Sequence, residues 1–428
     1  MFLLKLKLWE MSCTMVSRER KPRSETAFNQ RFTRVSSNLT HQVHVMLTMS
    51  FISTFGRQIA FTYLSIFLSE SSQDGGFGFD PSFVGFMIMV GGLANTFALL
   101  VTGSLCDRFG RKRMMMASMI PLAILTAAFS FIHTPAEFLL LYAATGVLLA
   151  LNDPAYSAMI ADIVPPERRE EIYGLSYMIN NLGAAIGPPV GGFLIGLNGY
   201  QPLFAYSACF VAASAIIVTL LIKESSPENA DAISLSRFAG VFKDRIFILF
   251  CLMGALTNVV YTQFYGLLSV YTTHLDFAPI VFGTLFSFNA ILVVALQIPI
   301  RKGTMRIGPT KGFIVAQLLY AVGFTYFMFA ADFIQLALGV AVLTLGEIIF
   351  VPASSGFVAN LAPADMRGRY MAMLGLFFGI GGSIGSQVAF SIYGMLADKQ
   401  FVWGILGLIG FATLIGYGVL FKVARGKT

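Results

Sequence analysis

Long apolar runs divide the chain into a series of predicted membrane-spanning helices. A hydrocarbon core of about 30 Å needs roughly 20 apolar residues per helix, and twelve runs of this kind follow one another with polar breaks between them. They are too long and continuous for the alternating segments of about ten residues that build a membrane β-barrel. The runs lie near residues 43–69, 82–104, 114–133, 136–162, 172–197, 201–222, 244–273, 279–300, 311–330, 333–360, 370–396 and 401–423.

The composition supports lipid as the solvent for most of these runs. The chain is 56% hydrophobic and only 12% charged, and a soluble protein of 428 residues has too few interior positions for that much apolar surface. We therefore predict an all-α membrane protein. The four cysteines and four histidines show no metal-ligand spacing, so we expect no disulfide framework, no metal site and no cofactor.

The basic residues indicate how the chain is oriented. Eight of the 29 lysines and arginines lie in residues 1–42, and nearly all the others fall in alternate connections between runs. Basic residues favour cytoplasmic loops. We therefore predict a multi-pass protein of the plasma or inner membrane with both termini in the cytoplasm. The net charge of +7 is explained by this topology, so no nucleic-acid partner is expected beside the lipid bilayer.

An offset of 198 residues relates the two halves of the chain. At this offset Gly110 falls on Gly308 and Pro154 falls on Pro352, as do several other glycines, prolines and arginines, without a gap. Two parallel repeats of six helices with a cavity between them are the architecture of alternating-access transporters. The predicted parts are a cytoplasmic arm (1–42), a first six-helix bundle (43–222), a cytoplasmic linker (223–242), a second bundle (243–423) and a cytoplasmic tail (424–428).

A dense group of charges separates the second and third runs. The basic residues alone fit a signal that holds a loop in the cytoplasm, but they leave the acidic residue at the head of the group unexplained. The pattern Gly-x-x-x-Asp-Arg-x-Gly-Arg-Lys resembles the signature loop of the major facilitator superfamily. The matching residues are Gly103, Asp107, Arg108, Gly110, Arg111 and Lys112.

The resemblance implies that this loop is a breakable cytoplasmic latch between the halves. Asp107 is expected to contact the start of the eleventh helix, near Arg369 and Tyr370, when the cytoplasmic side is closed. Asp162 is the expected partner of the arginines in the loop. The equivalent loop of the second half has Met305 at the position of Asp107, so the two gates are not expected to be equivalent.

A second motif lies in the fifth run. The stretch GAAIGPPVGG resembles a pattern of that superfamily's drug:proton antiporters, and the resemblance implies a seal against leakage through the centre. Close packing of helices by small residues is the alternative explanation. The fourth run has Tyr142 where the family usually carries an arginine, so no proton relay is transferred to that position. The motif residues are Gly183, Gly187, Pro188, Gly191 and Gly192.

Three ionisable residues lie far from the ends of their runs: Arg57, Asp153 and Glu347. Burying such a group in a membrane costs at least a few kcal/mol, and the resemblance implies that their three spans line a central cavity. We predict that Asp153 carries a proton with Arg57 as its electrostatic partner. Glu347 is predicted to recognise a cationic substrate or to act as a second acid, and ion pairs that fix helices are the alternative. Asn258, Tyr261 and Gln263 are predicted to complete the polar lining.

These features together favour a secondary active transporter over other classes. The leading hypothesis is a monomer that exports lipophilic or amphipathic small molecules in exchange for protons, with the proton gradient as its energy source. Export or symport of one specific metabolite or lipid is the alternative. An enzyme would need a catalytic constellation and a receptor a soluble sensing domain, and the sequence shows neither. It also lacks a nucleotide-binding loop.

Overall fold

The computed structural model describes residues 41–225, 241–242, 244–363 and 366–425, and the elements in these ranges are helical. Most of the predicted arm and linker, and the end of the tail, lie outside the described residues. The chain separates into the units Met1–His44 and Val45–Thr428, and of the first unit only the start of one helix is described. All contacts reported below belong to the second unit.

The first half contains six predicted runs and six helical regions. The first region is α3 (His41–Phe61) followed by the short α4 (Leu64–Ser69). The others are α5 (Pro81–Phe109), α6 (Arg111–Ala128), α7 (Pro135–Ile163), α8 (Pro166–Asn198) and α9 (Gln201–Leu221).

The second half repeats this order. Its first region is α10 (Arg245–Tyr261), the 3-10 turn η4 (Thr262–Phe264) and α11 (Leu267–His274). The others are α12 (Pro279–Ile307), α13 (Pro309–Phe327), α14 (Phe333–Leu361), α15 (Arg367–Met395) and α16 (Phe401–Arg425). Ten of the described helices are long and apolar enough to cross a membrane, and Lys311–Phe327 is a shorter apolar helix. The predicted all-α membrane fold is confirmed.

The offset of 198 residues reappears in the helix boundaries. It carries both ends of α5 onto the ends of α12, and both ends of α7 onto the ends of α14. The glycines that follow α5 and α12 also correspond: Gly110 has a φ of 91° and Gly308 a φ of 80°. Side chains other than glycine rarely adopt such angles. The repeated glycine therefore makes the same tight junction with the next helix in both halves.

The first and seventh predicted runs are interrupted, which the apolar pattern does not reveal. The helix stops between α3 and α4 at Thr62 and Tyr63, and the segment around Thr262 is a 3-10 turn between α10 and α11. The Thr262 hydroxyl donates to the Asn258 carbonyl at 2.8 Å. A threonine that bonds back to its own helix competes with the backbone ladder and often bends it.

Polar caps fix several helix ends. Asp80 accepts a hydrogen bond from the Ser82 backbone N–H at the start of α5. Thr134 and Glu137 form a reciprocal capping box at the start of α7. These caps satisfy backbone donors that the first turn of a helix leaves open.

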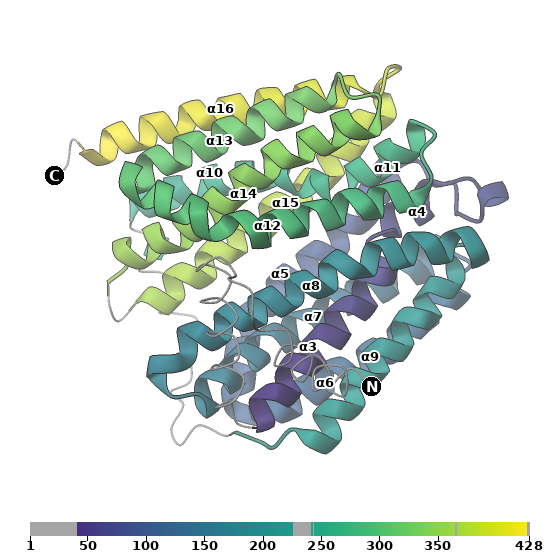
Figure 1. Cartoon of the computed structure of the whole chain (residues 1–428), viewed down its shortest axis with the longest axis horizontal. Coiled ribbons are helices and arrows are strands. Elements are labelled where there is room, and N and C mark those ends of the chain that lie inside the picture. The colour runs from purple at the N-terminus through teal and green to yellow at the C-terminus, as the bar shows by residue number, and fades with distance from the viewer. Residues whose placement is uncertain (1–40, 226–240, 243, 364–365, 426–428) are drawn as a thin grey trace, which may run out of the picture. The chain divides into compact units, whose positions relative to one another are not determined.

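The two most extensive helix pairs between the halves both use small residues. Helix α5 packs against α15, and α8 packs against α12 (Figure 1). A Cβ added at Gly85 would lie 2.7 Å from the Phe390 Cβ, and one at Gly283 would lie 2.7 Å from the Pro188 carbonyl oxygen. Real Cβ atoms do not approach other atoms this closely. Glycine is therefore required for these helices to touch at their observed separation.

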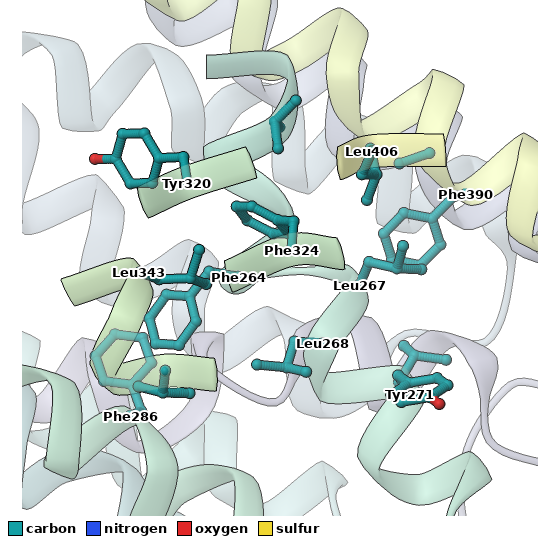
Figure 2. Close-up of a cluster of buried hydrophobic side chains, with 14 of the residues drawn as sticks. Phe264, Leu267, Leu268, Tyr271, Phe286, Tyr320, Phe324, Leu343, Phe390 and Leu406 are labelled. Atoms are coloured by element: carbon teal, nitrogen blue, oxygen red, sulfur yellow. The ribbon is translucent and has the colours of Figure 1, made fainter. Parts of the chain in front are cut away.

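A large apolar core fills the second half. Figure 2 shows side chains from η4, α11, α12, α13, α14, α15 and α16 meeting in one cluster. The Phe264 and Phe286 rings stack with centroids 5.9 Å apart, and Phe324 stacks on Trp403 at 6.1 Å. Such aromatic pairs add packing energy beyond their buried area. They hold the helices that carry Glu347 and Tyr261.

Candidate substrate cavity and gate

A polar cavity of about 460 Å³ lies between α3, α6, α7 and α8. Hydroxyl and amide groups dominate its walls, and three tyrosines contribute rings with a polar tip. A purely hydrocarbon occupant could not form hydrogen bonds with these polar groups. The walls are therefore suited to water or to a polar ligand. The polar lining residues are Ser50, Ser53, Thr54, Gln58, Asn152, Tyr156, Ser157, Tyr173, Ser176, Tyr177, Asn180 and Asn181, together with Arg57 and Asp153.

Helical spacing explains why these residues share one cavity. The lining residues of α3 follow one another at steps of one, three or four, and those of α7 and α8 do the same. Residues three and four apart lie on one face of a helix. Each helix therefore presents one polar stripe to the cavity. The sequence prediction missed most of these residues, although a polar stripe at helical spacing inside an apolar run was the signal that could have found them.

Hydrogen bonds between helices set the positions of the walls. The Asn180 Oδ1 atom on α8 accepts from the Ser50 hydroxyl at 2.6 Å and from the Thr54 hydroxyl at 3.1 Å, both on α3. The hydroxyls of Tyr156 and Ser176 are 2.8 Å apart and link α7 to α8. A side chain held at several points keeps one orientation. The cavity is therefore built from positioned groups.

Arg57 and Asp153 are the two charged residues of the lining, and they face the cavity from different helices. The Arg57 Nε atom is buried and has no hydrogen-bond partner within the described residues. Asp153 is exposed and accepts from the Asn152 Nδ2 atom at 3.1 Å. In the described part of the chain, no ion pair within 4.0 Å joins the two. The structure thus brings these predicted residues to one cavity without pairing them.

Glu347 lies on α14 in the second half, near enough to the cavity-lining Tyr177 to interact with it electrostatically. Its carboxylate accepts from the Asn289 Nδ2 atom at 3.0 Å, and the Tyr261 side chain lies close to it. The Tyr261 hydroxyl lies 2.8 Å from the Tyr265 hydroxyl, and the Tyr261 ring packs against Tyr320 with centroids 5.5 Å apart. Glu347 is therefore a carboxylate surrounded by tyrosines. It does not line the cavity of the first half.

The other two predicted cavity residues of α10 and η4 make local contacts. The Asn258 Nδ2 atom donates to the Gly254 carbonyl at 3.0 Å, and the Gln263 Nε2 atom donates to the Val259 carbonyl at 2.8 Å. Gln263 is fully buried. Neither residue lines the cavity between α3, α7 and α8.

The charged loop between α5 and α6 is tied to the end of α7. The Arg111 Nε atom lies 3.1 Å from the Asp162 Oδ2 atom, and Arg111 also donates to the Cys106 carbonyl at 3.0 Å. The Arg111 side chain is 7% exposed and that of Asp162 is 28% exposed. Arg108 lies over the Phe109 ring at 5.4 Å. The side chains of Gly103, Asp107 and Met305 lie outside the described residues.

The same loop also holds the first residues of the linker. The Glu224 carboxylate accepts from the backbone N–H groups of Lys112 and Arg113 at 2.9 and 3.3 Å, at the start of α6. The Ser225 hydroxyl donates to Asp162 at 2.9 Å. A carboxylate at a helix N-terminus is favoured by the open N–H groups and the helix dipole. These contacts of the loop lie within the first half and the start of the linker.

The described hydrogen bonds between the halves lie away from this loop. The Gln387 Nε2 atom donates to the Ser82 carbonyl at 3.1 Å, near the start of α5, and the Ser287 hydroxyl donates to the Ala185 carbonyl. Tyr370, which the family resemblance implies would lie near Asp107 in a closed state, donates to Asp244 at 3.2 Å. The halves are therefore in contact along parts of α5 and α8 that lie away from the charged loop, from the start of α5 to its middle.

The motif glycines of α8 face two different neighbours. A Cβ at Gly183 would lie 3.1 Å from the Phe55 backbone nitrogen, and one at Gly187 would lie 2.9 Å from the Phe55 carbonyl oxygen. A Cβ at Gly191 would lie closer still to the α3 backbone, against the Ile59 carbonyl oxygen. Gly192 instead faces α12, where a Cβ would lie 2.5 Å from the Ile280 Cα. The carbonyl of Pro188 accepts from the Tyr63 hydroxyl. This motif thus joins α8 to α3 and, through Gly192, to the other half.

We expect Gly192→Val to loosen the contact between the halves and to make proteoliposomes leak protons, because the new methyl groups have no room beside Ile280. The matched control is Gly196→Val, one turn along α8, where a Cβ meets nothing within 4 Å. Both changes carry the same intrinsic helix cost. Passive proton flux is measured with a pH-sensitive dye inside the vesicles. Equal flux through both variants would contradict the role of Gly192 at this contact.

Comparison with known proteins agrees with this geometry. The profile of the Major Facilitator Superfamily matches residues 46–302 and 259–427. A Na(+), Li(+), K(+)/H(+) antiporter of Planococcus maritimus is 25% identical over 412 residues, which cover 87% of this chain and 93% of the relative. The multidrug resistance protein MdtH of Salmonella typhimurium is 26% identical over 329 residues, which cover 76% of this chain and 81% of the relative.

Solved structures show the same fold at low sequence identity. A crystal structure of the peptide transporter POT in complex with sulfate superimposes with a TM-score of 0.77 at 17% identity, covering 90% of this chain and 94% of that one. The profile match spans nearly the whole chain, and the repeated helices are those of a secondary transporter and not of an enzyme. The chain belongs to the major facilitator superfamily.

Proposed function

We propose that this transporter exports amphipathic compounds in exchange for protons by alternating access. The observation that carries the proposal is Asp153, a carboxylate exposed to a cavity within a membrane-spanning helix. An ionisable residue at such a place is costly and marks a proton or substrate path by default. Two of the relatives carry names of an antiporter and of a multidrug resistance protein, and these names support the same class of function.

The position of the contacts between the halves fits one state of this cycle. With basic residues on the cytoplasmic side, the charged loop faces the cytoplasm and the joined parts of α5 and α8 lie farther toward the outside. The halves are then closed on the outside. The arm and the tail are placed in the cytoplasm by the same rule. In this proposal residues 43–222 and 243–423 are the two moving bundles.

Proton release on substrate binding tests the direction of coupling. Purified protein in weakly buffered detergent is mixed with ethidium or dansylcadaverine, and a pH indicator follows the solution. Antiport requires the substrate to displace a proton, so the solution should acidify. Uptake of protons would instead support the alternative of a symporter for one metabolite or lipid. Acidification by sodium chloride, with no response to either dye, would point to an exchanger of inorganic cations and would contradict the proposal.

Glu347→Gln is expected to change which substrates are carried more than how fast protons move. The Glu347 carboxylate and the rings around Tyr261 form a surface that attracts organic cations by charge and by cation–π contact. Efflux of ethidium from loaded cells should fall at least about tenfold, because a lost charged contact costs more than about 1.4 kcal/mol. Glu167→Gln, at the exposed start of α8, is the control. An unchanged ethidium efflux in Glu347→Gln would contradict this role.

A further inference from the structure

We propose that the cavity between α3, α7 and α8 binds the zwitterionic head group of an amphipathic substrate. In this proposal Arg57 binds an anionic group such as a carboxylate, and Asp153 binds an ammonium group on the same molecule. The inference rests on the proposed function only in taking this cavity as the substrate site. The proposed substrate carries one positive and one negative charge.

Arg57 is available for an anion from outside the chain. A guanidinium has five N–H donors and no acceptor, and the Nε donor of Arg57 is buried without a partner among the described residues. Two neutral acceptors of the cavity are already engaged. Gln58 accepts from the Thr62 hydroxyl at 2.8 Å, and Asn180 Oδ1 accepts two hydroxyl donors. A planar anion is the natural partner of a guanidinium in this position.

Asp153 is available for a cation. An ionised carboxylate offers about four acceptor sites, and the one described hydrogen bond to Asp153 comes from the neighbouring Asn152 on its own helix. The side chain is exposed to the cavity. An ammonium group with three donors can therefore approach it without breaking a described ion pair.

The balance of charge favours a zwitterion over a simple ion. The lining holds one arginine and one aspartate, which are not joined to each other by an ion pair. A ligand with a single charge would satisfy one of them and leave the other without a counter-charge within a membrane-spanning helix, where an unpaired charge is costly. A zwitterion satisfies both at once and brings no net charge into the membrane.

The remaining walls suit a head group that carries an apolar tail. Met49, Met119 and Ala184 line the cavity beside the rings of Tyr156 and Tyr177. A volume of about 460 Å³ is within the range of pockets for drug-sized ligands. The volume far exceeds what an inorganic ion occupies. It holds an amino-carboxylate head with an aromatic group attached.

Such a substrate also explains the exchange with a proton. The ammonium group and a proton both neutralise the same carboxylate of Asp153, so binding of one opposes binding of the other. The displaced proton passes to the solvent. The anionic group at Arg57 then orients the molecule without taking part in the exchange.

Three dansyl compounds that differ only in charge test the proposal on purified full-length protein. Nε-dansyl-lysine is the zwitterion, dansylcadaverine is the same molecule without its carboxylate, and 6-(dansylamino)hexanoate is the same molecule without its amino group. Binding is measured by dansyl fluorescence in detergent at one pH. The wild-type protein should bind dansyl-lysine at least about tenfold more tightly than either relative, the factor expected for one charged contact.

Single substitutions assign each charge to its residue. Arg57→Gln should reduce dansyl-lysine affinity to that for dansylcadaverine, and should leave dansylcadaverine binding unchanged. Asp153→Asn should reduce the affinity for dansyl-lysine to the affinity for 6-(dansylamino)hexanoate. It should not weaken the binding of 6-(dansylamino)hexanoate itself. Arg245→Gln, at the exposed start of α10, is the charge-matched control. The unchanged binding of one probe in each variant shows that the variant is folded.

Either of two results would overturn the proposal. If the wild-type protein binds the three compounds equally, binds a singly charged compound best or binds none of them, the cavity does not select zwitterions. If Arg57→Gln weakens all three compounds alike, Arg57 shapes the cavity and does not bind the carboxylate. Proton release induced by ethidium, which is not one of these three compounds, is measured separately and distinguishes either result from a failure of the proposed antiport.

Discussion

Replacing Asp153 with asparagine is expected to abolish uphill transport driven by a pH gradient. The amide has nearly the same shape as the carboxylic acid but cannot release or bind a proton, so the exchange loses its proton carrier. The Asp153→Asn variant should not accumulate substrate against its gradient at all. Facilitated movement down a substrate gradient should persist at saturating substrate, because the cavity and Arg57 remain. The measurement is dansyl-lysine accumulation in proteoliposomes with an imposed pH gradient.

Asp398→Asn is the matched control, since Asp398 is exposed in the connection before α16. It should accumulate substrate as the unmodified protein does. Suppose Asp153→Asn keeps both uphill transport and substrate-induced proton release. Asp153 would then have a structural role, and Glu347, the other carboxylate that lies far from the ends of the predicted cavity spans, would become the candidate proton carrier.

Replacing Asp162 is expected to damage both stability and the gate. Asp162→Asn removes the carboxylate that pairs with the nearly buried Arg111 and weakens the acceptor of the Ser225 hydroxyl. We expect a loss of about 2 kcal/mol, less than the roughly 3–5 kcal/mol typical when one partner of a fully buried pair is removed, because Asp162 is 28% exposed. Thermal unfolding in detergent measures the change.

A double substitution separates the gate from simple stability. Arg111→Met with Asp162→Leu removes both charges together, and apolar replacements of a buried pair are often neutral or stabilising. We expect the double variant to recover thermal stability but to transport at least about tenfold more slowly, because the breakable electrostatic contact is gone. Full transport by a stable double variant would show that the ion pair only holds the helices together.

Much of the fold follows from local properties of the chain. Apolar length predicted the membrane helices, and the 198-residue offset predicted the correspondence that relates α5 to α12 and α7 to α14. The repeated glycines at 110 and 308 indicated junctions that need a positive φ, and both have one. Hydrophobicity, helix length and glycine geometry depend on neighbouring residues. They can therefore be read without knowledge of the tertiary packing.

Local properties of the sequence did not predict the interruptions of the first and seventh spans. Thr62 and Thr262 lie in continuous apolar runs, and a threonine is tolerated in many unbroken helices. Whether the helix continues depends on what the surrounding helices offer to the freed backbone groups. Tyr63, next to the first interruption, donates its hydroxyl to Pro188, which is 125 residues away.

By itself, the sequence determined that this is a two-fold repeated, all-α transporter with a charged loop and three ionisable residues within its spans. Tertiary structure alone decided that Arg57 and Asp153 share one cavity without pairing, that Glu347 lies among tyrosines outside the lining of that cavity, and that Glu224 caps α6. The physical reason is the separation in sequence of the residues that interact. A polar stripe identifies the polar face of a helix from neighbouring residues, but the helix that this face contacts depends on packing between segments far apart in the chain.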